Sequence, residues 1–253
     1  MAGSTTRDWD AGTYRRVALP HEEWARAVLD RLSLAGDETV LDAGCGSGRT
    51  TSILIERIPA GRVVAVDGSP SMVAKVREVL RPQDTAIVSD LTKLELEEPV
   101  DAIFSTAVFH WVLDHDALFA RMRAAVRAGG RFAAQCGGEG NIESFRLAGE
   151  EVARREPYAE HLGGVEKIWN YAGPEETEAR LRAAGFTDVS CRLEPWPVDP
   201  PEPAAYAKTV CLGPYVAELP EDLQDRFVAD VLATQADPLR LDYVRLNIEA
   251  TAA

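Results

Sequence analysis

The chain of 253 residues has no long hydrophobic run and no apolar signal core at its start. A membrane-spanning helix needs at least about 18 consecutive apolar residues, and no stretch of the sequence approaches that length. The first nine residues, Met1 to Trp9, are mostly small, polar or charged. These absences predict a cytoplasmic protein without a membrane partner.

Cysteine is also scarce, with only four residues in the chain. They are Cys45, Cys136, Cys191 and Cys211. No two of them form a C-x-x-C pair, and no histidine stands at metal-ligand spacing from them. The pattern predicts scattered reduced thiols and no metal site.

Basic residues are outnumbered, because 27 Lys and Arg face 41 Asp and Glu and leave a net charge of −14. An acidic chain repels a phosphate backbone, so we expect no nucleic-acid partner. Apolar residues make up 46% of the chain, which is ample for a core. The length fits one large domain or a domain with a cap.

The most informative segment runs from Thr39 to Thr51 and reads TVLDAGCGSGRTT. It is typical of a buried strand, a glycine-rich turn and the start of a helix. Glycines let a backbone pass close under a ligand, and a helix start offers free N–H groups. The pattern D-x-G-x-G-x-G is neither the dinucleotide G-x-G-x-x-G nor a P-loop, because Arg49 follows the last glycine.

A second apolar strand, Arg62 to Val66, leads directly into Asp67, which lies 19 residues past Gly48. This spacing suits a carboxylate that accepts two hydrogen bonds from ribose hydroxyls. A helix-capping role is the alternative for Asp67.

Strands and helices alternate along the chain, which indicates parallel β-α-β units with a ligand site at the carboxyl ends of the strands. Ser69 is predicted to cap its helix, with Pro70 at the first position. Ala128 to Gly130 are predicted to end a helix. Strands are predicted at 39–42, 62–66, 85–88, 100–106, 131–135, 187–193 and 241–248, and helices at 21–33, 49–58, 69–80, 116–127, 175–184 and 220–233.

After the fourth strand the chain reads FSTAVFHWVLDH from Phe104 to His115. With the glycine loop, Trp9-Asp10 and Tyr14, this segment resembles the trans-aconitate 2-methyltransferase group of the class I S-adenosylmethionine-dependent methyltransferases. The resemblance covers residues 8–136 and is weaker beyond. The chain departs from that group in its Arg127-Ala-Gly-Gly130 turn, which lacks a proline, and in the few polar side chains of 135–138.

The resemblance implies an α/β fold, a Rossmann-like sheet of seven mostly parallel strands with an antiparallel last strand, plus a helical cap. Strands near 190 and 244 would form the closing antiparallel hairpin. We expect a single methyltransferase domain over 1–253, as monomer or homodimer. Its expected parts are an N-terminal helical lid at about 1–35, a core at 36–137 and 176–253, a substrate cap at about 138–175, and a possible further cap element at about 195–235.

The implied cofactor is S-adenosyl-L-methionine, which leaves as S-adenosyl-L-homocysteine. In the family an acid after the third strand binds the adenine amino group, and Asp90 stands there. Tyr14 is a candidate to close over the sulfonium, or else packs on a helix. The expected cofactor residues are Tyr14, Asp42, Gly44, Cys45, Gly46, Gly48, Asp67, Gly68, Ser69, Met72, Asp90, Leu91, Ser105 and Thr106.

The expected partner is a small-molecule acceptor, with a carboxylic acid as the leading candidate. His110 lies just past the fourth strand, where it would act as a base, contact the substrate or simply pack at the lip. Arg146 and His161 are candidates to meet an anionic group. The substrate residues named by this reasoning are Tyr14, His110, Trp111, Arg146, Trp169 and Tyr171.

A carboxylate nucleophile needs no base, so the leading hypothesis is carboxylate O-methylation. The alternative is a base-assisted O-, N- or C-methyltransferase of secondary metabolism that uses His110. A non-catalytic binding module with the cofactor fold is the alternative from another class.

Overall fold

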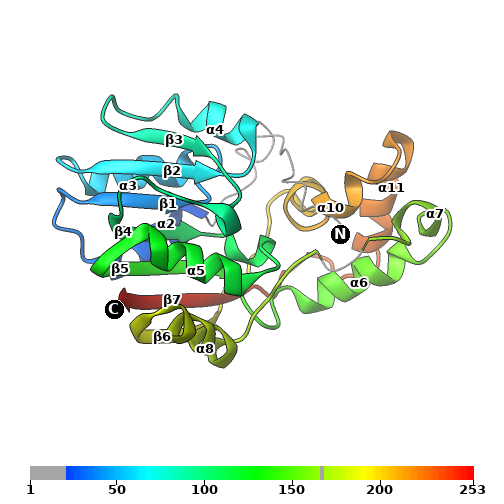
Figure 1. Cartoon of the computed structure of the whole chain (residues 1–253). Coiled ribbons are helices and arrows are strands. Elements are labelled where there is room, and N and C mark those ends of the chain that lie inside the picture. The colour runs from blue at the N-terminus through cyan, green and yellow to red at the C-terminus, as the bar shows by residue number, and fades with distance from the viewer. Residues whose placement is uncertain (1–20, 166–167) are drawn as a thin grey trace.

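The computed structural model of the protein describes residues 21–165 and 168–253. Seven strands form one sheet in the order β3-β2-β1-β4-β5-β7-β6 (Figure 1). Strand β7 runs antiparallel to β5 and β6, whereas the other pairs are parallel. The predicted Rossmann-like sheet is therefore confirmed. Its strands are β1 Thr39–Ala43, β2 Arg62–Asp67, β3 Thr85–Val88, β4 Val100–Thr106, β5 Val126–Gly137, β6 Phe186–Pro195 and β7 Val244–Ala252.

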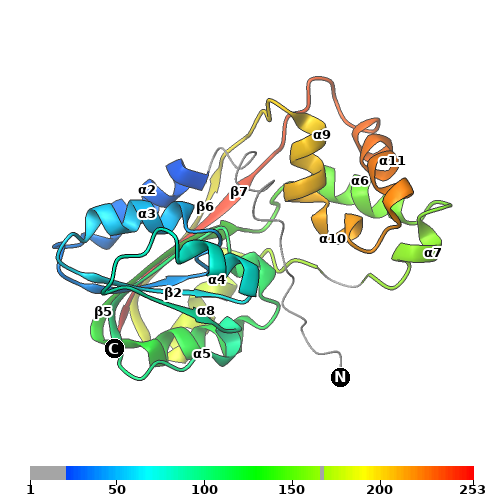
Figure 2. The same ribbon diagram turned by 90° about the horizontal axis from the view of Figure 1, so that it is seen from above.

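Helices cover both faces of the sheet (Figure 2). Helices α2 (His21–Leu32), α3 (Arg49–Arg57) and α4 (Pro70–Val76) lie on one face, and α5 (His115–Ala125) and α8 (Pro174–Ala184) lie on the other. Neighbouring strand residues point to opposite faces. Val40 accordingly packs in the core under α2 and α3, and Leu41 packs in the core under α5.

Helix α2 belongs to this sheet layer, because Ala25, Val28 and Leu32 on it pack in one core with strand residues such as Val40. The described part of the segment expected as an N-terminal lid is thus a covering helix of the sheet. The remainder of that segment, with Tyr14 and Trp9-Asp10, lies outside the described residues.

A second group of helices gathers beyond the carboxyl ends of the parallel strands (Figures 1 and 2). Two stretches of chain build it, one after β5 and one between β6 and β7. Their side chains share an apolar core of their own, which includes Tyr158, Tyr215 and Phe227. The elements are α6 Glu143–Ala153, α7 Ala159–Leu162, α9 Pro203–Tyr206, the π-helical turn η3 Ala207–Cys211, α10 Gly213–Val216 and α11 Glu221–Leu232.

The prediction that Ala128 to Gly130 end a helix was wrong. Helix α5 already ends at Ala125, and the two glycines lie within β5 at an irregularity of its pairing with β4. A Cβ at Gly130 would lie 2.4 Å from Cγ2 of Val126, so the bulge needs glycine. The glycines therefore mark a bulge in a strand.

The expected antiparallel pairing of the last two strands is confirmed, but the predicted start of the final strand at residue 241 was wrong. Strands β6 and β7 do pair antiparallel, but residues 196–243 separate them. The final strand begins at Val244 and ends at Ala252, because Leu241 forms only an isolated bridge with Val198. The sequence pattern missed this shift since Leu241 and Tyr243 are apolar residues buried beside the strand.

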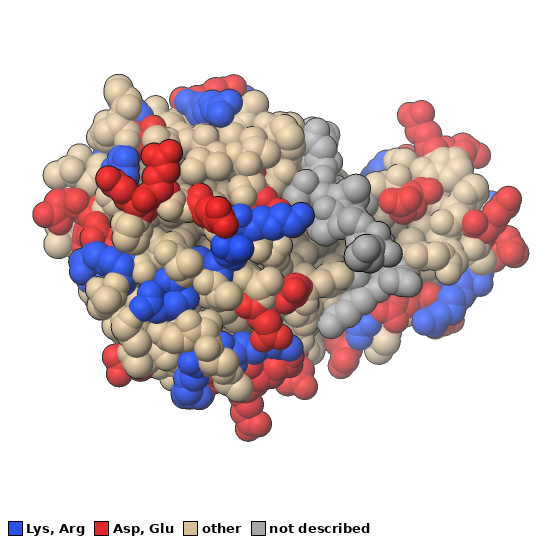
Figure 3. All heavy atoms as spheres, viewed as in Figure 1, with Lys and Arg blue, Asp and Glu red and all other residues tan. Residues whose placement is uncertain are grey.

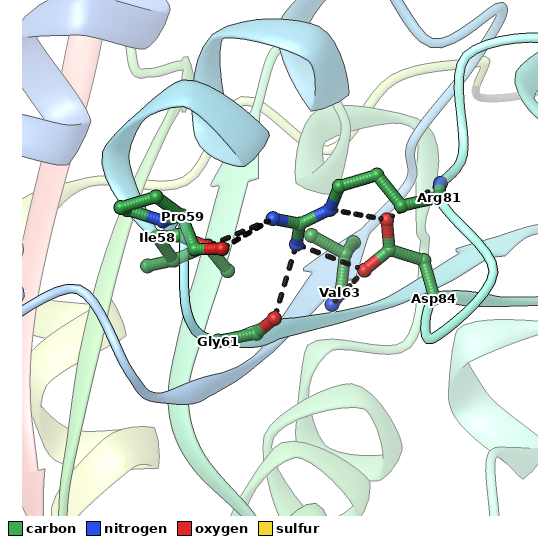
Figure 4. A network of polar contacts seen from close by, with 6 residues as sticks. All are labelled: Ile58, Pro59, Gly61, Val63, Arg81 and Asp84. Carbon is green, nitrogen blue, oxygen red and sulfur yellow. Dashed lines mark hydrogen bonds and ion pairs between the residues drawn. The ribbon is translucent and has the colours of Figure 1, made fainter.

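A polar cluster lies at the amino end of β2, at the end of the sheet away from the second group of helices (Figure 4). The Arg81 guanidinium donates to the carbonyl oxygens of Ile58 (3.0 Å) and Gly61 (3.1 Å) and to Asp84 Oδ2 (2.9 Å). Asp84 Oδ1 accepts from the Val63 N–H at 2.8 Å. Burial alone would raise the pKa of Asp84, but these hydrogen bonds lower it below its ordinary value. The cluster ties the start of β2 to the loops beside it.

Charged side chains of both signs are interspersed over the face drawn in Figure 3. Among the helices of the described ranges, none has the length and apolar character that crossing a bilayer requires.

Candidate functional site

The glycine loop follows β1 in a tight path between β2 and the segment after β4. The N–H groups of Gly44 and Cys45 both donate to the Val66 carbonyl, at 2.8 and 2.9 Å. Gly44 has φ 87°, and a Cβ on it would lie 2.3 Å from Cγ2 of Val108. Only glycine fits there, because both the conformation and the space exclude a side chain.

Asp67, at the end of β2, reaches back to this loop. Its Oδ2 accepts from the Gly46 N–H and its Oδ1 from the Ser69 N–H, both at 2.9 Å. Burial is the largest influence on this carboxyl and raises its pKa, while the hydrogen bonds from Ser69, Gly46 and Gly68 oppose that shift. Each carboxylate oxygen has a further lone pair, so Asp67 retains capacity to accept hydrogen bonds from a ligand.

Asp42, in β1, is a buried carboxyl with one satisfied oxygen. Thr51 donates to its Oδ2 at 2.7 Å, whereas Oδ1 is buried without a hydrogen-bond partner among the described residues. Burial raises the pKa of Asp42 to about 7. Thr106 Oγ1, at the end of β4, is likewise buried and unpartnered within those ranges. Such orphaned oxygens at the carboxyl ends of adjacent strands indicate a polar ligand.

The other candidate cofactor residues lie at or just after the carboxyl ends of β1 to β4. Ser69 caps α4 with Pro70 behind it, as predicted, and Met72 is buried in the first turn of that helix. Asp90 caps the short 3₁₀ helix η1 (Leu91–Lys93), in which Leu91 is buried. The remaining positions have structural partners. Ser105 Oγ donates to the Ala43 carbonyl at 2.6 Å, Gly48 caps α3 with φ 90°, and burial raises the pKa of the Cys45 thiol far above its ordinary value.

A run of aromatic rings leads from the end of β4 towards the outer helices. His110 lies in the 3₁₀ helix η2 (Phe109–Trp111), and its ring stacks on Tyr171 with centroids 5.8 Å apart. Tyr171 in turn stacks on Trp169 at 5.9 Å, and Trp111 contacts Trp169 at 6.0 Å. The Gly137 N–H donates to His110 Nδ1 at 3.2 Å.

Two of these rings, Trp169 and Tyr171, border a cavity of about 460 Å³. Of the residues expected to contact the substrate, Arg146, Trp169 and Tyr171 line it, whereas His110 and Trp111 contact the lining rings without lining the cavity themselves. His161 is exposed on α7 and does not line the cavity. The other lining residues, which sequence reasoning missed, are Glu139, Gly140, Asn141, Glu143, Glu150, Arg154, Val165, Ile168, Asn170 and Tyr215.

The cavity holds more acid than base. Arg146 pairs with Glu150 on the next turn of α6 and lies 3.8 Å from Glu143. These contacts largely neutralise the one arginine that the sequence singled out. The sequence spacing along α6 predicts these i, i+3 and i, i+4 pairs, but it does not predict that they lie on the side of the helix that lines the cavity.

Comparison with known proteins identifies the family. A model of the methyltransferase domain matches residues 40–130. The trans-aconitate 2-methyltransferase of Variovorax paradoxus is 32% identical, over 94% of each chain. Among solved structures, the YcgJ protein of Bacillus subtilis covers 92% of this chain and 99% of its own, with 15% identity and a TM-score of 0.64. A geranyl diphosphate C-methyltransferase from Streptomyces coelicolor, solved with S-adenosyl-L-homocysteine, covers 90% and 78%, with 18% identity and a TM-score of 0.53.

The structures establish the fold, and the V. paradoxus relative covers nearly the whole chain. The glycine cradle, Asp67 and the orphaned oxygens of Asp42 and Thr106 fit a polar, cationic nucleoside at the strand ends. A non-catalytic module is thereby set aside, and the cofactor is S-adenosyl-L-methionine. The chain belongs to the family of S-adenosylmethionine-dependent methyltransferases that includes the trans-aconitate 2-methyltransferases.

Proposed function

We propose that the enzyme methylates a carboxylate oxygen of a small organic acid. Two findings support the proposal. Relatives of this chain are trans-aconitate 2-methyltransferases. In this chain, the Gly137 N–H donates a hydrogen bond to His110 Nδ1. That bond occupies the lone pair of Nδ1, so the neutral ring carries its hydrogen on Nε2. A ring in this tautomer donates a hydrogen bond and is poorly suited to remove a proton.

This tautomer suits a carboxylate acceptor. A carboxylate is ionised at neutral pH and attacks without a base, so the enzyme needs only to orient it. His110 donating to one carboxylate oxygen would aim the other at the methyl group. The runner-up, a phenol, amine or carbon nucleophile, needs a base that this histidine does not offer in the observed arrangement.

The cofactor supplies a methyl group on a positively charged sulfur. In this proposal the glycine loop lies beneath its methionine end, Asp67 accepts from its ribose and Asp90 from its adenine amino group. Trp169 and Tyr171 exclude water from the acceptor side. Asp42 faces the cationic end and stabilises it.

The acceptor class is tested by the chemistry of the product. Purified enzyme is incubated with methyl-labelled cofactor and a panel of di- and tricarboxylic acids, phenols and amines. We expect label only with acids, in a product that releases volatile methanol in mild alkali, as a methyl ester does. Alkali-stable label on a phenol or amine would contradict the proposal and favour the base-assisted alternative.

Substitution of His110 distinguishes its two candidate roles, a hydrogen-bond donor to the acceptor and a general base. We expect His110→Ala to raise KM for the acid about 10- to 100-fold, the loss of one hydrogen bond to a charged group, at all pH values from 6 to 9. His110→Gln retains a donor and should lose only a few-fold. A general base predicts instead a fall in kcat for both variants that recovers as the pH rises.

Cofactor affinity is expected to depend on pH through Asp42. Its pKa of about 7 means that the carboxyl is neutral below that pH and charged above it. S-adenosylmethionine should therefore bind about 10-fold more tightly at pH 8 than at pH 6, because a buried anion stabilises its sulfonium. S-adenosyl-L-homocysteine, which lacks that charge, and the Asp42→Asn variant provide flat controls in calorimetric titrations.

The raised pKa of Asp42 also affects the stability of the ligand-free protein. The folded chain keeps a proton on Asp42 that the unfolded chain has released, so the free energy of unfolding falls as pH rises from about 4 towards 7.

Equal affinity for S-adenosylmethionine at pH 6 and pH 8 would remove Asp42 from the cofactor site.

A further inference from the structure

Arg245, the second residue of β7, is a buried cation that has no anionic partner among the residues the structure describes. Its side chain is 1% exposed, and Nη2 has no hydrogen-bond partner among the described residues. Its Nε makes one long hydrogen bond, 3.4 Å, to Gln135 Oε1. No carboxylate within the described ranges forms an ion pair with it. Arginine is seldom buried in this way unless it is paired, because desolvating the charge is costly.

Aromatic rings account for only part of this environment. The guanidinium carbon lies 4.0 Å from the centroid of the Trp24 ring and 5.8 Å from that of Tyr243. Neither ring supplies the hydrogen-bond acceptor that Nη2 lacks, and a carboxylate oxygen is the acceptor that a guanidinium N–H binds most strongly.

The sheet register places Arg245 beside the acceptor site. Its backbone partner on β5 is Gly137, whose N–H holds His110. Directly opposed residues project to the same face of a sheet. A Cβ on Gly137 would lie 2.6 Å from Cε1 of Tyr171, so Tyr171 and the Arg245 side chain lie on that face together.

Two further observations connect Arg245 to the cavity wall. Val244, the residue before it, donates its N–H to Asn141 Oδ1 at 3.1 Å, and Asn141 lines the cavity. Burial raises the pKa of Tyr171, and the positive charges of Arg245 and Arg146 act in the opposite direction. Of the two, Arg146 already has carboxylate partners.

We propose that Arg245 binds a carboxylate of the acceptor other than the one that is methylated. A carboxylate whose two oxygens both bind a guanidinium is poorly placed to attack the methyl group and is less nucleophilic. A second carboxylate bound there would instead anchor the acceptor. The acceptor would then be held with one carboxylate on Arg245 and another beside His110. This inference rests on the proposed function and narrows it.

Thermal unfolding with and without ligand tests the role of Arg245 independently of turnover. Trans-aconitate, with S-adenosyl-L-homocysteine present, should raise the wild-type midpoint, and Arg245→Met should abolish that rise. Without ligand, Arg245→Met should unfold at the wild-type temperature or above, because methionine removes an unpaired buried charge and keeps the volume. Arg31→Met is the matched control, since Arg31 lies 3.5 Å from Glu249 and should leave the ligand-induced rise intact.

Kinetic measurements identify which carboxylate is bound. We expect Arg245→Met to raise KM for the diacid at least 30-fold and to leave the Kd for S-adenosylmethionine unchanged, with Arg245→Lys in between. An equal loss of cofactor affinity would assign Arg245 to the cofactor carboxylate and overturn the proposal. So would a ligand-free Arg245→Met midpoint several degrees below wild type with an intact ligand-induced rise, because the arginine would then be purely structural.

The outcomes separate this proposal from the proposed function. An Arg245-dependent shift with trans-aconitate, but no methyl ester from any acid, would leave the carboxylate site standing and refute the function. Ester formation that is equally fast with wild type and Arg245→Met would support the function and refute the role of Arg245.

Discussion

Replacement of Asp67 by alanine is expected to weaken S-adenosylmethionine binding by about 1.5–3 kcal/mol, or roughly 10- to 150-fold, the cost of losing hydrogen bonds to a charged group. The effect has two sources. The carboxylate would accept from the ribose hydroxyls, and it also holds the N–H groups of Gly46 and Ser69 at 2.9 Å. Calorimetric titration with the cofactor measures the total.

Asp67→Asn is the control for the second source. The amide keeps one oxygen that can accept from the loop, but it loses the charge and one acceptor. We expect an intermediate Kd and a melting temperature close to wild type. If Asp67→Ala bound the cofactor as tightly as wild type does, Asp67 would serve only to order the loop.

Gly44→Ala is expected to destabilise the fold itself, by about 2–4 kcal/mol. The new Cβ would meet Val108 Cγ2 at 2.3 Å and Cγ1 at 2.4 Å, and alanine is strained at φ 87°. Denaturant unfolding of the ligand-free protein measures this. Val108→Gly in the same chain removes the collision and should recover part of the loss.

Gly46→Ala is the matched comparison, because its φ is 51° but no atom lies within 4 Å of the added Cβ. We expect a small loss of stability and a much larger loss of cofactor affinity, since the open space above Gly46 is where the cofactor would lie. Similar unfolding curves for the two alanine variants would show that the crowding at Gly44 relaxes at little cost.

The sheet was predictable because its signals are local. Each parallel strand is a continuous apolar run, and the D-x-G-x-G-x-G loop permits few alternatives at the end of β1. Errors arose where a distant partner decides the outcome. Gly129 and Gly130 are typical of a helix end, but their role depends on how β5 pairs with β4. The start of β7 is set by its pairing with β5, in which Arg245 lies opposite Gly137, a residue far away in the sequence.

The acceptor side was only partly predictable for the same reason. Arg146, Trp169 and Tyr171 were selected by residue type and line the cavity, whereas His161 was selected on the same grounds and lies outside it. Arg245 was missed. The alternation of Arg245, Asn247 and Glu249 predicts a polar face on the last strand, but only the pairing with β5 shows that this face lies beside His110.

The position of β7 determines the order in which the molecule can assemble. Strand β6 reaches the sheet only through β7, since the order at that edge is β5-β7-β6. A nascent chain can join its first five strands as they leave the ribosome, but β6 has no sheet neighbour until β7 has been made. The acceptor half is therefore finished only after β7 has been made, whereas the cofactor loop belongs to the part that can form first.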